Sequence, residues 1–101
     1  MDLHETAIVE SGAVVRSPAS IDAGTVIQEG TYVGPYTSIG PNCTVENVHI
    51  ENSIVVRDAR ISADKTIVDS LIGTGARIED ASDRLPSGTR LVLGENSNVE
   101  I

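Results

Sequence analysis

The stretch LHETAIVESGAVVRSPASIDAGTVIQEGTYVGPYTSIGPNCTV, from Leu3 to Val45, decides the fold of this chain. Every sixth residue in it is aliphatic: Leu3, Val9, Val15, Ile21, Ile27, Val33, Ile39 and Val45. Neither an α-helix, with a period of about 3.6 residues, nor an isolated strand, with a period of about 2, produces this spacing. A chain that turns a corner every six residues does, because each short side sends one aliphatic side chain to a shared interior. The stretch is therefore a hexapeptide repeat.

Two further positions of the repeat fit the same geometry. The fifth position is always small, which predicts a second inward side chain beside a tight corner: Ala7, Ala13, Ala19, Thr25, Thr31, Thr37 and Cys43. The corners themselves are expected at residues that tolerate a positive φ: Gly12, Gly24, Gly30, Gly34, Gly40 and Asn42. Three sides per turn give a coil of 18 residues, so we predict an all-β fold, a parallel β-helix with triangular coils.

The repeat shortens after Val45. The aliphatic series continues as Val45, Ile50, Val56, Ile61, Ile67, Ile72 and Ile78, with steps that alternate between five and six residues. The small residue moves to the fourth position of the shortened units: Val48, Ser53, Ala59, Ser70 and Ala81. Stacking by coil predicts about four and a half coils and three interior ladders: Leu3–Ile21–Ile39–Val56–Ile72, Val9–Ile27–Val45–Ile61–Ile78 and Val15–Val33–Ile50–Ile67.

The length and composition indicate one domain over residues 1–101. We expect regular coils over 3–80, an irregular loop over 79–90, which is rich in Asp, Ser, Pro and Gly, and a terminal strand or cap over 91–101. The only aromatic residues are Tyr32 and Tyr36, which fits a narrow prism filled by aliphatic ladders. The single cysteine, Cys43, excludes an intrachain disulfide and is expected in the core.

The charge of the chain excludes two classes of partner. Its net charge is −8, and its seven Lys and Arg residues are scattered. Nucleic acid and anionic membrane both need clustered cations, so we expect neither. No apolar run reaches the length of a membrane span, and the acidic N-terminus is not that of a secretory signal. The sequence therefore predicts a soluble, cytoplasmic protein.

Few residues suggest chemistry. His4 and His49 are the only histidines, too few for the three-histidine metal sites known in this fold, and we expect no metal or cofactor in this chain. His49 is the one candidate for a general base, as in acyltransferases of this fold, and is expected to point to solvent. The stretch Gly88-Thr-Arg-Leu91 imitates the end of a nucleotide-binding motif, but Pro86 precedes it and a terminal strand is expected after it, so we interpret it as coincidence.

Three segments closely resemble one family. They are Tyr32-Val-Gly-Pro-Tyr-Thr-Ser-Ile-Gly40, Val45-Glu-Asn-Val-His-Ile-Glu-Asn-Ser-Ile-Val55, and Arg90-Leu-Val-Leu-Gly-Glu-Asn-Ser-Asn-Val-Glu-Ile101. The chain resembles, over essentially its whole length, the C-terminal left-handed β-helix of long-form glucose-1-phosphate thymidylyltransferases, which make dTDP-glucose for deoxysugar pathways. The resemblance implies a left-handed coil, which the spacing alone does not show.

The resemblance implies no catalytic residue in this chain. In that family, a preceding α/β domain carries the Gly-rich loop, the catalytic lysine and the metal-binding aspartates, so Mg²⁺ is expected only there. Lys65, the only lysine, lies within the repeat. We therefore expect these residues to be a fragment, a truncated gene product or a stand-alone relative of the enzyme. The alternative is a small hexapeptide-repeat acyltransferase that uses His49 and acyl-CoA.

Outward apolar residues on successive coils mark candidate surfaces for self-association. β-Helices of this kind commonly assemble as trimers packed side by side, so we expect a homo-oligomer and favour a trimer. Stacked apolar pairs are better interface candidates than single exposed residues. Three such pairs occur, one on each face: Ile8 with Val26, Val14 with Tyr32, and Ile54 with Leu71.

Overall fold

The computed structural model describes residues 2–79, 92–93 and 98–100, with side chains described from Leu3 to Glu79. Its strands are two or three residues long and form three parallel sheets. Sheet A contains β1 (Asp2–Leu3), β4 (Ala19–Ile21), β7 (Thr37–Ile39), β10 (Ile54–Val55), β13 (Leu71–Ile72) and β15 (Val92–Leu93). Sheet B contains β2 (Ile8–Val9), β5 (Val26–Ile27), β8 (Thr44–Glu46), β11 (Arg60–Ser62), β14 (Arg77–Glu79) and β16 (Asn98–Glu100). Sheet C contains β3 (Val14–Val15), β6 (Tyr32–Val33), β9 (His49–Glu51) and β12 (Thr66–Val68).

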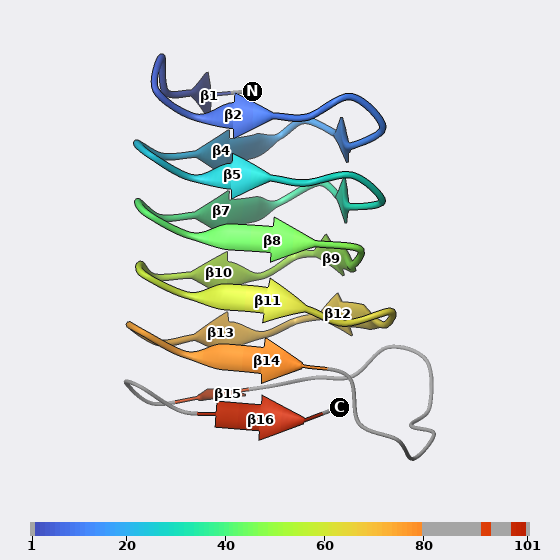
Figure 1. The fold of residues 1–101 in the computed structure, drawn as a ribbon, viewed down its shortest axis with the longest axis vertical. Coiled ribbons are helices and arrows are strands. Elements are labelled where there is room, and N and C mark those ends of the chain that lie inside the picture. The colour runs from blue at the N-terminus through green and yellow to red at the C-terminus, as the bar shows by residue number, and fades with distance from the viewer. Residues whose placement is uncertain (1, 80–91, 94–97, 101) are drawn as a thin grey trace.

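The chain visits sheets A, B and C in turn and pairs each strand with the one a coil later. In Figure 1 the strands of sheet B run to the right in front, those of sheet A run to the left behind, and the chain descends. This path is a left-handed coil, an exception to the right-handed rule for parallel crossovers. The predicted fold, a left-handed parallel β-helix, is confirmed. Residues 2–79 make four complete coils and two strands of a fifth.

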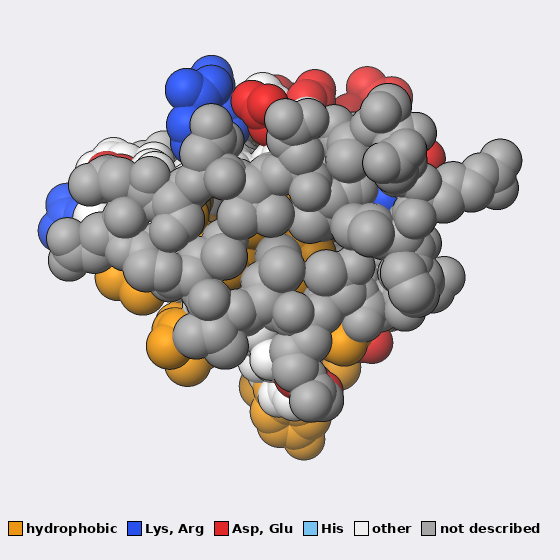
Figure 2. Space-filling view, turned by 90° about the horizontal axis from the view of Figure 1, so that it is seen from below, with side chains coloured by type: hydrophobic (Ala, Val, Ile, Leu, Met, Phe, Trp, Pro, Cys, Tyr) orange, Lys and Arg blue, Asp and Glu red, His pale blue; other side chains and the backbone are white. Residues whose placement is uncertain are grey.

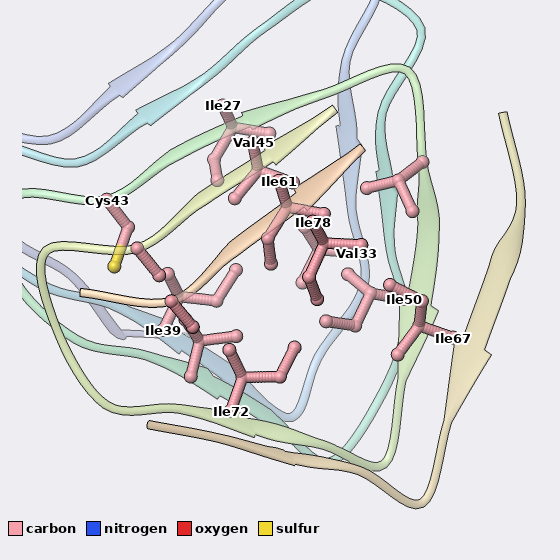
Figure 3. Close-up of a cluster of buried hydrophobic side chains, with 14 of the residues drawn as sticks. Ile27, Val33, Ile39, Cys43, Val45, Ile50, Ile61, Ile67, Ile72 and Ile78 are labelled. Carbon is pink, nitrogen blue, oxygen red and sulfur yellow. The ribbon is translucent and has the colours of Figure 1, made fainter. Parts of the chain in front are cut away.

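The interior consists of three aliphatic ladders, one on each side of the triangle (Figure 3). Pairing within the sheets sets Leu3, Ile21 and Ile39 above one another, then Val9, Ile27 and Val45, and Val15 and Val33. From the second coil onward these side chains are almost fully buried. Two predicted ladders are confirmed over their described length, and the third needs one change.

Val55, not Val56, occupies the interior of the fourth coil. Val55 pairs with Ile39 on one side and with Ile72 on the other, and only 1% of it is exposed. Val56, predicted to be the rung, is 41% exposed. The prediction was wrong because Val56 keeps a strict alternation of five and six residues, whereas the chain trims two successive units, from Val45 to Ile50 and from Ile50 to Val55. The observed steps from Val45 to Ile78 are 5, 5, 6, 6, 5 and 6 residues.

The corners follow one local rule. Ten of the described corners contain a residue with positive φ: Gly12, Gly24, Gly30, Tyr36, Asn42, Asn47, Asn52, Asp58, Asp69 and Gly75. A small inward residue follows directly, and the next rung comes two residues later, because strand side chains alternate between faces. The positive-φ residue lies three positions after the rung in six-residue units and two positions after it in five-residue units. Trimming therefore removes one residue between the rung and the bend.

Gly34 and Gly40, predicted to be bends, are not among the residues with positive φ. In the corner after Val33, Tyr36 makes the bend in place of Gly34, with φ of 62°. In the corner after Ile39, Asn42 makes it in place of Gly40. Gly40 is required for a different reason: a Cβ there would lie 1.6 Å from the carbonyl oxygen of Val56. At Gly34, a Cβ would lie 2.6 Å from the Cβ of Glu51. These two glycines allow neighbouring coils to approach each other closely.

The C-terminal tail continues the β-helix with two strands. β15 pairs with β13 in sheet A and β16 pairs with β14 in sheet B. The sequence predicted a terminal strand or cap over 91–101. The predicted loop, apart from Glu79, and the small position assigned to Ala81 lie outside the described residues.

Candidate functional site

One face of the β-helix is apolar. On sheet A, Ile54 of β10 and Leu71 of β13 are direct neighbours across the strands, with 52% and 44% of their surface exposed. Val56 follows β10 on the same side, and Tyr36, which is 70% exposed, lies at the corner before β7. We call Tyr36, Ile54, Val56 and Leu71 the apolar face. A shallow hollow of about 440 Å³, which includes Tyr36 and Ile54 in its lining, lies beside it.

The neighbouring face, formed by sheet B, is charged. On sheet B, Arg60 and Arg77 are neighbours in adjacent strands, and Glu79 lies opposite Ser62. The guanidinium of Arg77 lies 3.7 Å from the carboxylate of Glu79, and the Ser62 hydroxyl donates a hydrogen bond of 2.9 Å to Glu46. Figure 2 shows the separation from the C-terminal end: Lys, Arg, Asp and Glu side chains gather along the upper edge and hydrophobic ones along the lower.

The other two predicted pairs are stacked as expected. Ile8 pairs with Val26 in sheet B, and Val14 pairs with Tyr32 in sheet C. Ile8 is 54% exposed and Val14 41% exposed, whereas Val26 and Tyr32 are half-buried. Their role in an interface stays a prediction. The sequence did not identify Tyr36 or Val56 as surface residues of the apolar face, and the two-residue step from Ser53 to the next rung was the signal that could have placed Val56 outside.

His49 lies on the outer surface of sheet C. Its ring packs on Tyr32, with centroids 4.4 Å apart, and its Nε2 lies 3.7 Å from a carboxylate oxygen of Glu51. Although 43% of the side chain is exposed, the Nε2 atom itself is buried and has no hydrogen-bond partner among the described residues. His49 itself, together with Asp64 and Lys65, is among the residues that line a groove of about 300 Å³. A general base must reach the proton that it removes, so Nε2 could act as one only after the ring leaves this position.

His4 and Cys43 have local structural roles. The Nδ1 of His4 accepts a hydrogen bond of 3.1 Å from the backbone N–H of Thr6. Cys43 is 1% exposed, as predicted for a core position. Burial raises the pKa of the Cys43 thiol, and hydrogen bonds to its surroundings offset only part of this effect. The thiol therefore behaves as a small apolar group.

Among the side chains that the structure describes, from Leu3 to Glu79, no group of three His, Cys, Asp or Glu residues is placed to hold a metal ion. The same residues contain no helix long and apolar enough to cross a membrane.

The fold is a left-handed β-helix, and its charged and exposed apolar side chains lie on the outer faces of the three sheets and at the corners. A family model described as the GMPPB C-terminal domain matches residues 15–100. The chain belongs to this family. The resemblance expected from the sequence, to the C-terminal β-helix of glucose-1-phosphate thymidylyltransferases, is confirmed.

Two curated proteins that match part of this chain are both named as nucleotidyl- or thymidylyltransferases. The low-salt glycan biosynthesis nucleotidyltransferase Agl11 of Haloferax volcanii is 57% identical over 60 residues, and the glucose-1-phosphate thymidylyltransferase of Streptomyces griseus is 42% identical over 60. Each match covers 59% of this chain but only 17% of the relative. Among solved structures, a putative acetyltransferase from Bacillus cereus is 14% identical, with a TM-score of 0.32 over 99% of this chain and 76% of that one.

Proposed function

We propose that this chain is the non-catalytic β-helix module of a sugar nucleotidyltransferase that resembles glucose-1-phosphate thymidylyltransferase and supplies dTDP-glucose. The observation that carries the proposal is the match of residues 15–100 to a C-terminal domain family, together with relatives named as nucleotidyltransferases. Nucleotidyl transfer, and the Mg²⁺ that it uses, belong to a separate catalytic domain. The module contributes structure, assembly and regulation to the enzyme.

The packed interior is consistent with a module that has no internal active site. From the second coil onward its rungs are Ile and Val side chains with almost no exposed surface, and small residues such as Ala59 and Cys43 are buried beside them, so the centre of the prism is packed rather than hollow. Residues that can contact a partner therefore lie only on the outer faces and at the ends of the β-helix.

The apolar face supports self-association. A chain with a net charge of −8 repels its own copies unless they meet through a surface with little charge. The described outward residues of sheet A carry few ionisable groups, namely His4 and Asp22, and they include the stacked pair Ile54 and Leu71. We propose that the module forms a homotrimer and that the apolar face is buried between its chains.

The absence of catalysis is tested on the purified chain. We expect no dTDP-glucose from dTTP, glucose 1-phosphate and Mg²⁺, and no binding of acetyl-CoA in a calorimetric titration. Formation of dTDP-glucose by these 101 residues would overturn the proposal. Binding of acetyl-CoA that is lost in His49→Ala would instead favour the acyltransferase hypothesis, which predicts a role for this side chain.

The interface is tested by light scattering with matched variants. We expect a mass three times the 10.6 kDa of one chain. Leu71→Asp places a carboxylate in the apolar face and should yield monomers, because burying an unpaired charge between chains is costly. Ile8→Asp, at a similarly exposed position on sheet B, is the control and should leave the trimer intact. A monomer mass for the unaltered chain, or dissociation by Ile8→Asp but not by Leu71→Asp, would contradict the assignment.

A further inference from the structure

Two arginines face each other across neighbouring strands of sheet B. Arg60 of β11 and Arg77 of β14 are register partners, and both side chains are exposed. The two strands lie one above the other at the front of Figure 1. Neighbouring strands are about 4.8 Å apart, and like charges placed opposite each other across strands destabilise a sheet. On its other side Arg60 faces Thr44, a neutral residue. We call Arg60 and Arg77 the arginine pair.

The nearby carboxylates neutralise the arginine pair only weakly. None of the ion pairs in the described part of the chain includes Arg60. Arg77 lies 3.7 Å from Glu79, which is longer than a hydrogen bond, and both side chains are more than half exposed. Exposed ion pairs of this kind contribute little to stability. Glu46 accepts its hydrogen bond from the Ser62 hydroxyl instead. A chain with only seven Lys and Arg residues against fifteen Asp and Glu residues therefore sets two of its cations against each other.

The arginine pair lines a groove of about 280 Å³ on the surface of sheet B. The lining also contains neutral hydrogen-bonding side chains and two carboxylates: Gln28, Thr44, Ser62, Glu46 and Glu79. Guanidinium groups suit a phosphate group because their paired N–H donors match its oxygens. Amides, hydroxyls and carboxylates suit the hydroxyls of a sugar, which both donate and accept hydrogen bonds. The volume is at the lower end for small-ligand sites, so it fits a monosaccharide phosphate better than a nucleotide sugar.

We propose that this groove binds a monosaccharide phosphate. The phosphate lies between Arg60 and Arg77, and the sugar hydroxyls face Gln28, Thr44 and Glu46. The bound phosphate offsets the repulsion within the arginine pair. The carboxylates of the lining disfavour a bare anion, whereas a sugar gives them hydroxyl donors. Binding itself goes beyond the proposed function, and only its use to regulate nucleotidyl transfer rests on that function.

Calorimetric titration of the purified 101-residue chain with glucose 1-phosphate tests the site. We expect saturable binding of one molecule per chain, weakened at least tenfold in Arg60→Gln and in Arg77→Gln. Arg57→Gln is the matched control, because Arg57 is also more than half exposed but pairs with Asp58 outside the groove. It removes the same charge and should keep the affinity within twofold. No binding by the unaltered chain, or an equal loss in all three variants, would overturn the inference.

The two halves of the ligand are separated by titrating each of them alone. Inorganic phosphate and glucose should each bind at least tenfold more weakly than glucose 1-phosphate, because each meets only part of the groove. Inorganic phosphate that binds as tightly as the sugar phosphate would overturn the assignment of the ligand class. Absence of binding together with absence of dTDP-glucose formation would refute the site and leave the proposed function standing.

The ligand-free chain supplies an independent measurement. Arg60→Gln removes one of two facing like charges, so the urea midpoint of the ligand-free variant should be no lower than that of the unaltered chain. A clearly lower midpoint would show that Arg60 stabilises the fold itself, and it would overturn the repulsion on which the inference depends. Arg60→Lys keeps the charge but lacks the planar guanidinium, and it should still weaken binding of glucose 1-phosphate. Unchanged affinity in Arg60→Lys would contradict paired hydrogen bonds to the phosphate.

Discussion

Replacing Val55 and Val56 one at a time by alanine tests the arrangement of the fourth coil. The two residues are adjacent and chemically identical, but Val55 is 1% exposed and Val56 is 41% exposed. Each substitution removes the same two methyl groups, so a difference in stability reports burial alone. Neither change alters charge or adds a polar group.

The expected loss follows from transfer and cavity terms. Two buried carbon groups at about 0.8 kcal/mol each contribute roughly 1.6 kcal/mol. The cavity left between Ile39 and Ile72 adds up to about 1 kcal/mol if the neighbouring rungs do not close it. Val55→Ala should therefore lower the free energy of unfolding by about 2–2.5 kcal/mol. Val56→Ala should change it by less than about 0.5 kcal/mol, as is usual for exposed positions.

Urea denaturation followed by circular dichroism measures the difference. At an unchanged m value, the shift in the midpoint reports stability directly. For a domain of this size, about 2 kcal/mol lowers Tm by roughly 8–16 °C, which a thermal scan resolves easily. Equal losses in the two variants, or a larger loss for Val56→Ala, would refute the assignment of Val55 to the interior.

Three further substitutions or titrations have defined outcomes. Gly40→Ala should cost more than about 3 kcal/mol, above the usual range for overpacking, because its Cβ would meet the backbone oxygen of Val56; a Tm within 2 °C of the unaltered chain would contradict this. Thr25→Val should cost about 1–3 kcal/mol in urea denaturation, since the Thr25 hydroxyl donates to the Gly40 carbonyl at 2.6 Å and accepts from the Cys43 N–H at 3.0 Å; an unchanged midpoint would count against these bonds. Because burial raises the pKa of Cys43 above its ordinary 9.0, the unfolded chain ionises first and stability should fall as the pH rises above 9.0, an effect absent in Cys43→Ala.

The sequence determined the architecture well because the repeat is redundant. Each aliphatic rung is supported by a small residue and a bend, so the three sheets and their registers could be predicted through Val45. The shortened region was ambiguous only where two valines are adjacent. The rule that a rung lies two residues after the small inward residue, here Ser53, would have selected Val55. That rule follows from the alternation of side chains along a strand.

The outer faces could be predicted less completely. Stacking of Ile54 on Leu71 followed from the coil length, but the contribution of Tyr36 did not, because glycines at 34 and 40 offered simpler bends. Those glycines are needed for close approach between coils, as the contact of Gly40 with Val56 shows. Such an approach depends on the three-dimensional spacing of coils and leaves no local pattern in a single chain. The exposure of Leu3 likewise depends on which coils lie above it.

The shortened corners at Asn47, Asn52 and Asp69 indicate where a β-helix of this kind tolerates insertions and deletions. Each of these corners has one residue fewer between the rung and the bend than the six-residue units have, while the neighbouring rungs keep their register. A one-residue deletion inside a strand would instead turn every following side chain to the opposite face until the next bend. Insertions and deletions in this lineage should therefore gather at the three vertices of the triangle, where length can drift while the faces stay fixed.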